Sequence, residues 1–420
     1  MVKIKKLANG LRTIIIPVSG TKTATVLIMV GTGSKYENKN NNGISHFLEH
    51  MFFKGTEKRP TATAISSELD GIGGEYNAFT GKEITGYYAK VDAEKIEVAL
   101  DVLSDMLLNS QFDEEEIKRE KGVIIEEINM YEDNPLMHIE DVFEECLYGD
   151  QPAGWETIGT KENIVKMKRD DFVNYIKSQY GTKSAVVAVA GKIDRKTTAL
   201  INKYFSKFPK NKFIDKGKIK DVQAEPSVKI KNKKTDQAHI SLGVRAYKAG
   251  HKDEYILKAI SILLGGSMSS RLFINLRERN GLAYYVRTGT EFYTDSGYMT
   301  TQAGVPVDKI EDAIKIIASE YKRLKDELVD KNELEKVMDM IKGKLVIQME
   351  ASEANANWYA RQVIMNKKIS APEEYLKKIK QVKPKDIMRV AREVFRNEKL
   401  NLAVIGPYEE SEKFKKLLNV

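Results

Sequence analysis

The chain has 420 residues, enough for two or three domains, and its 42% hydrophobic and 30% charged content is typical of a soluble globular protein. It lacks any run of about 18 apolar residues and an apolar signal core near its start, and one cysteine excludes an internal disulfide, so we expect a cytoplasmic protein with no membrane partner. The net charge of +8 comes from lysines scattered among acidic residues without a nucleic-acid-binding motif, so we expect no nucleic-acid partner.

The first informative segment, residues 43–53, reads Gly-Ile-Ser-His-Phe-Leu-Glu-His-Met-Phe-Phe. His46, Glu49 and His50 stand at positions i, i+3 and i+4, which places their side chains on one face of a helix. Two imidazoles at this spacing can bind one Zn²⁺, and the carboxylate beside them can take a proton from water. Only 5 histidines occur in the chain, so chance gives this pattern on the order of a percent of the time. His-x-x-Glu-His is the inverted-zincin signature and predicts a zinc hydrolase.

Two strands are predicted after this helix. Residues 73–80 read Gly-Gly-Glu-Tyr-Asn-Ala-Phe-Thr, and residues 84–91 are again rich in aromatic and β-branched side chains. The Gly-Gly start favours a strand near a sheet edge. Such an edge can accept an extended peptide through main-chain hydrogen bonds. The alternative interpretation is an ordinary hairpin strand with no ligand.

A catalytic zinc needs a third protein ligand, and residues 118–130 offer candidates. Apolar residues at helical intervals predict one face of a long helix there. Glu120 and Glu127 are seven residues apart and share a second face, so both could point at a metal. Glu126 is the neighbouring alternative, rotated by about 100°.

These residues also allow interpretations other than a catalytic metal site. Histidine and glutamate on a helix are often solvated or satisfied by hydrogen bonds alone. A structural zinc is normally closed by four protein ligands, usually including cysteine, and this chain has only Cys146. The pattern therefore favours a catalytic metal. A His₂Glu site also accepts Co²⁺ or Mn²⁺, so the identity of the metal stays open.

Residues 269–286 carry the main signal of the second half. They predict a helix ended by Asn280-Gly281 and followed by a strand. Arg277 and Tyr284 flank this turn. From the residues alone, Arg277 is a surface charge and Tyr284 a core residue.

Residues 91–100 resemble residues 305–314 at an offset of 214, and Gly191 and Gly406 close similar strands at an offset of 215. The pattern predicts two homologous domains at 1–210 and 226–420, joined by a lysine-rich linker at 211–225. Each half predicts an α+β domain with helices on a mostly antiparallel sheet.

The second copy is expected to hold no metal. At offset 214, the four residues His46, Glu49, His50 and Glu127 correspond to apolar residues, namely Ile260, Leu263, Leu264 and Ile341.

The chain resembles the pitrilysin family of inverted-zincin metallopeptidases over nearly its whole length. Glu127 stands 77 residues after His50, where the family has its third ligand, and Glu120 matches a supporting glutamate. The resemblance implies His46 and His50 as zinc ligands and Glu49 as the general base.

The same resemblance implies that Asn77 and Ala78 contact the substrate backbone. It also implies that Arg277 and Tyr284 bind the substrate and stabilise the tetrahedral intermediate.

The family fold, of the processing-peptidase and LuxS-like metallohydrolase type, agrees with the α+β prediction. Relatives of this length work as dimers, so we expect a homodimer, or a heterodimer with a related subunit, in which Arg277 and Tyr284 act on the partner's zinc site. The predicted function is zinc-dependent endopeptidase cleavage of peptides or unfolded precursor segments in an enclosed chamber. The alternative is a non-catalytic or regulatory subunit of a hetero-oligomeric processing peptidase.

Overall fold

The computed structural model describes residues 2–365 and 368–420. The chain forms two mostly antiparallel β-sheets with helices packed on their faces. This arrangement confirms the predicted α+β class. The chain forms two compact units, and both are discontinuous in sequence. The first contains Met1–Asn129, Glu156–Gly217 and Val346–Ile369, and the second contains Met130–Trp155, Lys218–Leu345 and Ser370–Val420.

The first unit carries the sheet of the N-terminal half. Its strands are β1 (Lys3–Lys6), β2 (Arg12–Pro17), β3 (Thr23–Val30), β4 (Glu75–Thr80), β5 (Thr85–Asp92) and β6 (Ala185–Gly191). Its helices are α1 (Ile44–Met51), α2 (Ala62–Asp70), α3 (Ile96–Asn109), most of α4 (Glu114–Asp133), α6 (Lys161–Lys166), α7 (Arg169–Gln179), α8 (Thr197–Phe205) and α12 (Ser352–Ile364), with short 3-10 turns at Ser34–Tyr36 and Ala93–Lys95.

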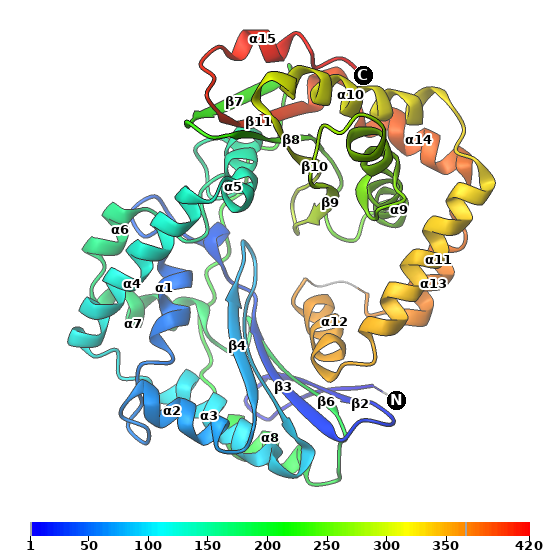
Figure 1. Ribbon diagram of the computed structural model, residues 1–420. Coiled ribbons are helices and arrows are strands. Elements are labelled where there is room, and N and C mark those ends of the chain that lie inside the picture. The colour runs from blue at the N-terminus through cyan, green and yellow to red at the C-terminus, as the bar shows by residue number, and fades with distance from the viewer. Residues whose placement is uncertain (1, 366–367) are drawn as a thin grey trace. The chain divides into compact units, whose positions relative to one another are not determined.

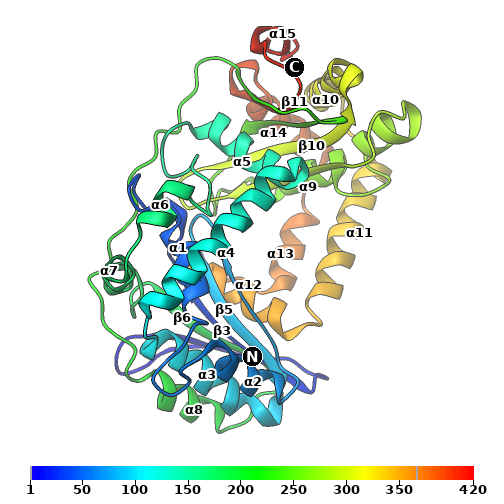
Figure 2. The same cartoon turned by 60° about the vertical axis from the view of Figure 1, so that its left-hand side comes forward.

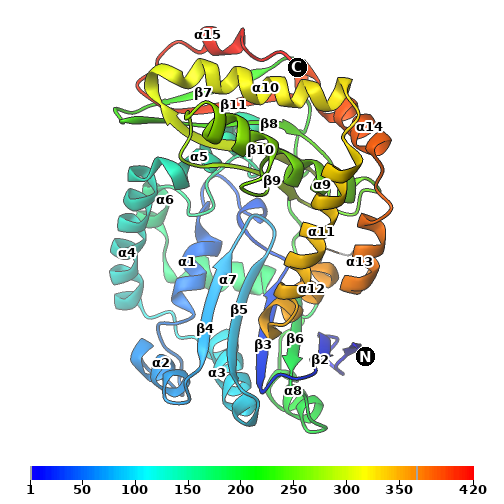
Figure 3. The same ribbon diagram turned by 45° about the vertical axis from the view of Figure 1, so that its right-hand side comes forward.

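The strand order of this sheet is β1-β2-β6-β3-β5-β4, with only β2 and β6 parallel. Strand β6 is buried throughout, which explains its continuous apolar sequence. Strand β4 pairs only with β5, so the edge strand predicted within residues 73–80 is confirmed, with the strand itself at Glu75–Thr80. Figure 3 shows β4 at the end of the sheet, next to α1.

Helix α12 covers one face of this sheet although it comes from the second half of the chain. Ala356, Tyr359, Ala360 and Val363 form a core with residues of β2, β3 and β6. In Figure 1, the orange helix lies against the blue and green strands. Helix α3 packs on β3 and β5.

The second unit repeats the plan. Its strands are β7 (Ser227–Asn232), β8 (Gln237–Arg245), β9 (Val286–Phe292), β10 (Gly297–Pro306) and β11 (Leu400–Gly406), in the order β7-β11-β8-β10-β9. Its helices are α5 (Pro135–Tyr148), α9 (Glu254–Gly265), a π-helix (Phe273–Arg279), α10 (Ile310–Asp326), most of α11 (Lys331–Gln348), α13 (Pro372–Ile379), α14 (Pro384–Val394) and α15 (Ser411–Lys415), with 3-10 turns at Val307–Lys309 and Asn397–Lys399.

The duplication inferred from sequence is visible in this topology. The order β2-β6-β3-β5-β4 matches β7-β11-β8-β10-β9, and in each sheet the first pair is parallel. Helix α5 packs on β7, β8 and β11 of the second sheet, as α12 packs on the first. The two halves have therefore exchanged equivalent helices.

This exchange makes the compact units differ from the contiguous domains predicted at 1–210 and 226–420. Residues 130–155 belong to the second unit and residues 346–369 to the first, because the apolar faces of α5 and α12 are buried on those sheets. The predicted linker at 211–225 contains no helix or strand, and the unit boundary falls within it, after Gly217. Within the described residues, no helix combines the length and apolarity needed to span a bilayer.

Candidate metal centre

Helix α1 is anchored at its first turn by Glu37. The two carboxylate oxygens of Glu37 accept hydrogen bonds from the backbone N–H groups of Gly43 and Ser45, each at 2.8 Å. Burial raises the pKa of Glu37, against these hydrogen bonds, which favour the ionised form. Gly43 has φ +98°, and a Cβ there would lie 2.7 Å from the Ile158 carbonyl oxygen, so the helix start requires glycine.

His46, His50 and Glu127 come together as predicted. One potential ligand atom from each residue lies within 4.8 Å of the other two. Glu127 Oε2 lies 3.7 Å from His46 Nε2 and 3.5 Å from His50 Nε2. Figure 2 shows α4 running past α1. Helix α4 carries Glu127, and α1 carries the two histidines. Ile117, Ile124 and Ile128 are buried and fix the opposite face of α4.

Glu120 supports the second histidine. Its Oε1 lies 2.8 Å from His50 Nδ1, and its Oε2 lies 2.5 Å from Lys54 Nζ. Burial opposes ionisation of Glu120, but the hydrogen bonds from His50 and Lys54 outweigh it and hold its pKa below the ordinary value. An ionised Glu120 accepts a hydrogen bond from the Nδ1–H group, which leaves Nε2 of His50 free to bind a metal. The alternative candidate, Glu126, is exposed and lies outside the cluster.

The electrostatics keep His46 in the form that a metal requires. Burial, and then the nearby His50, lower the pKa of His46 to about 3, so the imidazole is neutral at neutral pH. Neutral imidazole is the metal-binding form of histidine. Burial also raises the pKa of Glu127. A cation at this place would stabilise the ionised form of Glu127 against the cost of burial.

Glu49 faces the same region from the middle of α1. Thr80 Oγ1, at the end of β4, donates a short hydrogen bond to Glu49 Oε2. Burial raises the pKa of Glu49, and the hydrogen bond from Thr80 and the charge of His50 oppose this rise. Thr80 thus fixes the carboxylate of Glu49 close to His50 and Glu127, where its affinity for a proton is increased.

These side chains fit a divalent cation such as Zn²⁺. Ligand atoms about 2.1 Å from one tetrahedral ion stand about 3.4 Å apart, close to the separations of Glu127 from the two imidazoles. Two nitrogens and one carboxylate oxygen are also the donor set of a catalytic zinc, in which a fourth position stays open. His46 Nδ1 is buried and finds no hydrogen-bond partner among the residues that the structure describes.

The predicted substrate-contact residues Asn77 and Ala78 lie on the outer strand β4. The side chain of Asn77 is exposed, and its Oδ1 accepts a hydrogen bond from the Ala78 N–H at 2.8 Å. Because β4 pairs only with β5, its other edge is open to a further strand. The strand end that carries Thr80 touches Glu49, so this edge leads directly to the candidate metal centre.

Comparison with known proteins identifies the family. The profile described as Insulinase (Peptidase family M16) matches residues 12–161, and the profile described as Peptidase M16 inactive domain matches residues 166–341. The uncharacterized zinc protease YmxG of Bacillus subtilis (strain 168) is 35% identical over 410 residues, covering 97% of this chain and 98% of that protein. The chain belongs to the M16 peptidase family. This membership confirms the resemblance inferred from the sequence.

Further M16 relatives agree in length and fold. An uncharacterized zinc protease of Streptomyces coelicolor is 32% identical, covering 97% of this chain and 90% of that protein. The crystal structure of a protease from Helicobacter pylori matches with a TM-score of 0.90 and 25% identity, covering 97% of this chain and 99% of that chain. A peptidase M16 inactive domain structure from Pseudomonas fluorescens, at 17% identity and a TM-score of 0.89, covers 97% of this chain and 98% of that chain and shows the fold alone.

Arg277 and Tyr284 form a local pair in the second unit. Arg277 donates a hydrogen bond to the Tyr284 carbonyl oxygen at 2.8 Å, and its guanidinium lies 5.2 Å from the Tyr284 ring centre. The interpretation of Tyr284 as a core residue is wrong, because its side chain is 76% exposed. The turn between them contains Gly281 at φ +60°, which confirms the predicted left-handed stop, although the preceding turns form a π-helix.

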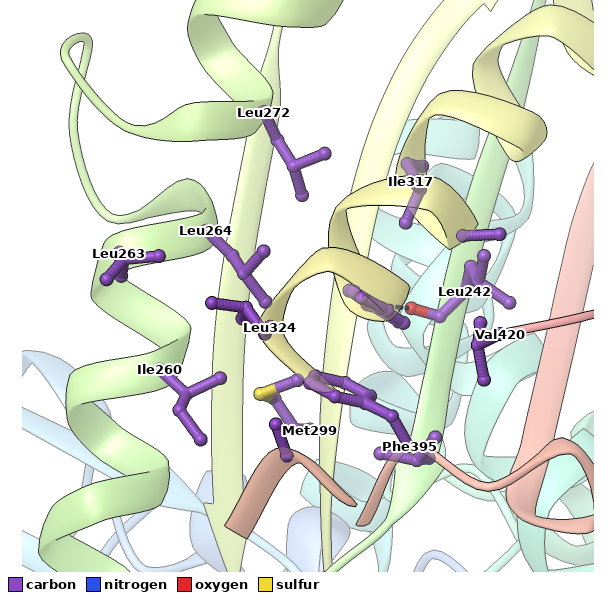
Figure 4. Packing of buried hydrophobic residues seen from close by; sticks show 14 of the residues in the cluster. Leu242, Ile260, Leu263, Leu264, Leu272, Met299, Ile317, Leu324, Phe395 and Val420 are labelled. Carbon is purple, nitrogen blue, oxygen red and sulfur yellow. Dashed lines mark hydrogen bonds between the residues drawn. The ribbon is translucent and has the colours of Figure 1, made fainter. Parts of the chain in front are cut away.

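In the second unit, a hydrophobic core replaces the metal-binding residues. The positions equivalent to the ligands and Glu49 are at most 6% exposed and belong to one apolar cluster, namely Ile260, Leu263, Leu264 and Ile341. Figure 4 shows the first three on α9, facing side chains of α10 and β10. Among the described residues, the one group arranged to hold a metal ion is the His46, His50 and Glu127 cluster.

Sequence reasoning did not identify three positioning residues of this M16 site. Glu37 caps α1, Thr80 holds Glu49, and Lys54 holds Glu120. No spacing marks Glu37 or Thr80, because loops and strand pairing bring them to α1. Lys54 stands four residues after His50, a spacing that places both side chains on the same side of a helix. This spacing is the one sequence signal that could have identified Lys54.

Proposed function

We propose that this M16 peptidase is a zinc-dependent endopeptidase that cleaves peptides and unfolded or precursor segments. His46, His50 and Glu127 would hold the ion. Zn²⁺, when bound, supplies Lewis-acid chemistry toward a water molecule and a carbonyl oxygen. The observation that carries the proposal is the convergence of these three ligand atoms beside a fourth group, Glu49, whose position is fixed by Thr80.

Glu49 is suited to act as the general base. It is half-buried beside His50, and its raised pKa brings it closer to the range in which a carboxylate can accept and then return a proton. We infer that Glu49 takes the proton of the attacking water and passes it to the leaving amine. Glu120 acts as a positioning residue through His50.

The open edge of β4 is suited to bind the peptide backbone. An extended substrate that pairs with this edge gains main-chain hydrogen bonds that do not depend on its sequence. Folded proteins offer few free extended segments, so this mode of binding favours peptides and unfolded chains. We propose that Asn77 and Ala78 contribute to this contact and that the reaction takes place in an enclosed chamber.

We further propose a homodimer in which Arg277 and Tyr284 of one copy serve the metal centre of the other. A guanidinium and a phenol hydroxyl are donors suited to an oxygen that gains negative charge. The exposure of Tyr284 supports a role at a surface that binds substrate or partner. A reducing, cytoplasmic setting belongs to the same proposal and is supported by the low cysteine content.

The alternative is a non-catalytic subunit of a hetero-oligomeric processing peptidase. The profile described as an inactive domain matches residues 166–341, a range that contains none of His46, Glu49, His50 or Glu127. A chain that keeps both the ligands and the base in contact distance is better suited to catalysis. Activity that appears only on addition of a second, related subunit would favour the alternative.

The deciding experiment compares wild type with Glu49→Gln by metal analysis and hydrolysis of a quenched peptide. We expect both proteins to contain about one zinc per chain, and Glu49→Gln to lose at least about 10²-fold in kcat. Treatment with 1,10-phenanthroline should abolish wild-type activity, and added Zn²⁺ should restore it. Undiminished turnover by Glu49→Gln, or by metal-free wild type, would exclude the mechanism.

A further inference from the structure

A cavity in the first unit lies on the sheet face that α12 covers. Its volume is about 420 Å³, within the range of small-molecule and side-chain pockets, and its walls come from β3, β4, β5 and the segment 347–357. Leu27, Tyr88, Ile347 and Ala354 supply apolar walls. The polar group that matters for recognition is Asn357 on α12.

Phe79, on the outer strand β4, is one of the residues that line this cavity. A Cβ at Gly86, its partner in the adjacent strand β5, would lie 2.3 Å from the Phe79 ring. The Phe79 ring therefore lies directly against Gly86. A side chain on residue 86 would occupy the space that the ring now takes. Phe79 is half-buried and packs with the α12 face of the sheet. It forms a wall of the cavity on the strand that we propose to bind the peptide.

The alternation of side chains along β4 explains how a substrate could reach the cavity. Thr80 points toward Glu49 and α1, whereas Phe79 points to the α12 face. A peptide paired with the edge of β4 would alternate in the same way, so every second side chain would lie on the α12 face. Those side chains pass over Phe79 toward the cavity, while the backbone stays at the edge that leads to Glu49.

Two of the residues that line the cavity, Glu353 and Asn357, each carry a buried acceptor oxygen without a hydrogen-bond donor among the described residues. Asn357 Oδ1 is buried and has no hydrogen-bond partner among the residues that the structure describes. The same holds for Glu353 Oε2, whose ion-pair partner Lys90 lies 3.4 Å away and donates a hydrogen bond to Oε1. A buried acceptor left unpaired loses its hydrogen bonds to water without replacement, so a ligand that brings an N–H or O–H donor is favoured.

We propose that this cavity is a specificity subsite for an aromatic side chain with a polar donor, tyrosine or tryptophan, of the bound peptide. The aromatic ring fills the apolar part between Leu27, Tyr88 and Ala354, and the donor reaches Asn357. This inference rests on the proposed peptidase function and adds a substrate class to it. The subsite selects a side chain, whereas the edge of β4 binds any backbone.

The test uses one quenched alanine-rich peptide in which tyrosine, phenylalanine or alanine occupies each position in turn. We expect kcat/KM to favour tyrosine over alanine by about tenfold or more at one position, or at two positions on the same face. Phenylalanine should fall between them, because it fills the cavity without supplying the donor.

Three variants on α12 separate two contributions to the preference for tyrosine, the filling of the cavity by the ring and the hydrogen bond to Asn357. Ala354→Trp places an indole in the cavity and should reduce the tyrosine-to-alanine ratio to about one. Asn357→Leu should equalise tyrosine and phenylalanine while keeping both ahead of alanine. Arg361→Trp puts the same indole on an exposed position of α12 outside the cavity and should leave both ratios unchanged. Ratios within one protein cancel any general loss of active enzyme.

The proposal is overturned if no position favours tyrosine, or if Ala354→Trp keeps the wild-type ratio. If wild type cleaves none of the peptides, the peptidase function fails and the cavity is tested by binding alone. Fluorescence anisotropy of the labelled tyrosine and alanine peptides should then still show a preference in wild type that Ala354→Trp removes. Equal binding of the two peptides to wild type would exclude the subsite itself.

Discussion

His50 Nδ1 lies 2.8 Å from Glu120 Oε1, and on the other side of the same ring Nε2 lies 3.5 Å from Glu127. One carboxylate thus sets the orientation and the tautomer of the imidazole, while the other shares its metal-binding side. The order of these two glutamates along α4 gives each a distinct role, although they lie on one helix face.

Replacing Glu120 should therefore weaken metal binding without removing a ligand. We expect Glu120→Ala to raise the dissociation constant for Zn²⁺ by about 10–100-fold, because His50 loses the acceptor that fixes its ring. Competition with a chromophoric chelator measures this constant. Glu126→Ala, on the exposed side of the same helix, is the matched control and should bind zinc as wild type does. Equal constants for the two variants would contradict the positioning role.

The dimer proposal can be tested by mixing two inactive variants. Glu49→Gln lacks the base, and Arg277→Ala lacks the proposed donor from the second unit. If each active site combines the first unit of one copy with the second unit of the other, random exchange should restore about a quarter of wild-type activity. The mixture is assayed after dissociation and reassembly, and each variant treated alone is the control. Activity no higher than that of the separate variants, despite exchange shown by native mass spectrometry, would argue against a shared site.

Arg59 should be a main determinant of the stability of the first unit. Its side chain is 1% exposed and bonds Asp105 at 2.8 Å, Asp101 at 2.9 Å and Glu68 at 2.6 Å, so it ties the loop after α1 to α2 and α3. Arg59→Leu leaves the buried Asp105 without its cation and should reduce the free energy of unfolding by about 3–5 kcal/mol. Urea denaturation measures this loss.

Lys58→Ala provides the comparison for Arg59. Lys58 also pairs with Asp101, but its side chain is 56% exposed, so its loss should cost less than about 1 kcal/mol. If Lys58→Ala and Arg59→Leu reduce the free energy of unfolding by similar amounts, burial of the Arg59 ion pairs does not increase their contribution to stability.

Asp101 should contribute to the loss of stability in acid. Burial opposes its ionisation, but the hydrogen bonds from Lys58 and Arg59 outweigh burial and hold its pKa below the ordinary value of 3.8. The unfolded chain therefore binds the proton more readily than the folded chain. The stabilisation is complete above the unfolded pKa and is lost as pH falls through the folded pKa.

Asp101→Asn should consequently flatten the dependence of unfolding free energy on pH between about pH 5 and pH 3. Urea denaturation at a series of pH values measures the slope. Asp339→Asn, an exposed aspartate on α11, is the control and should keep the wild-type slope. An unchanged slope in Asp101→Asn would mean that its pKa is the same in the folded and unfolded chain.

The sequence by itself determined the chemistry of the candidate site and the repeated plan of the fold. The spacing of His46, Glu49 and His50 is a property of one helix, and helical geometry alone puts them on one face. The apolar periodicity of α4 likewise placed Glu120 and Glu127 together. The choice of Glu127 as the third ligand, however, came from the family resemblance.

Only the tertiary structure decided which groups surround these residues. Thr80 reaches Glu49 through the pairing of β4 with β5, and Glu37 reaches α1 from a preceding loop, so neither contact has a signature in local spacing. The exchange of α5 and α12 was also invisible in sequence. An amphipathic helix records that one face must be buried, but not which sheet buries it. Pairings between segments distant in the chain depend on the packing of the whole unit.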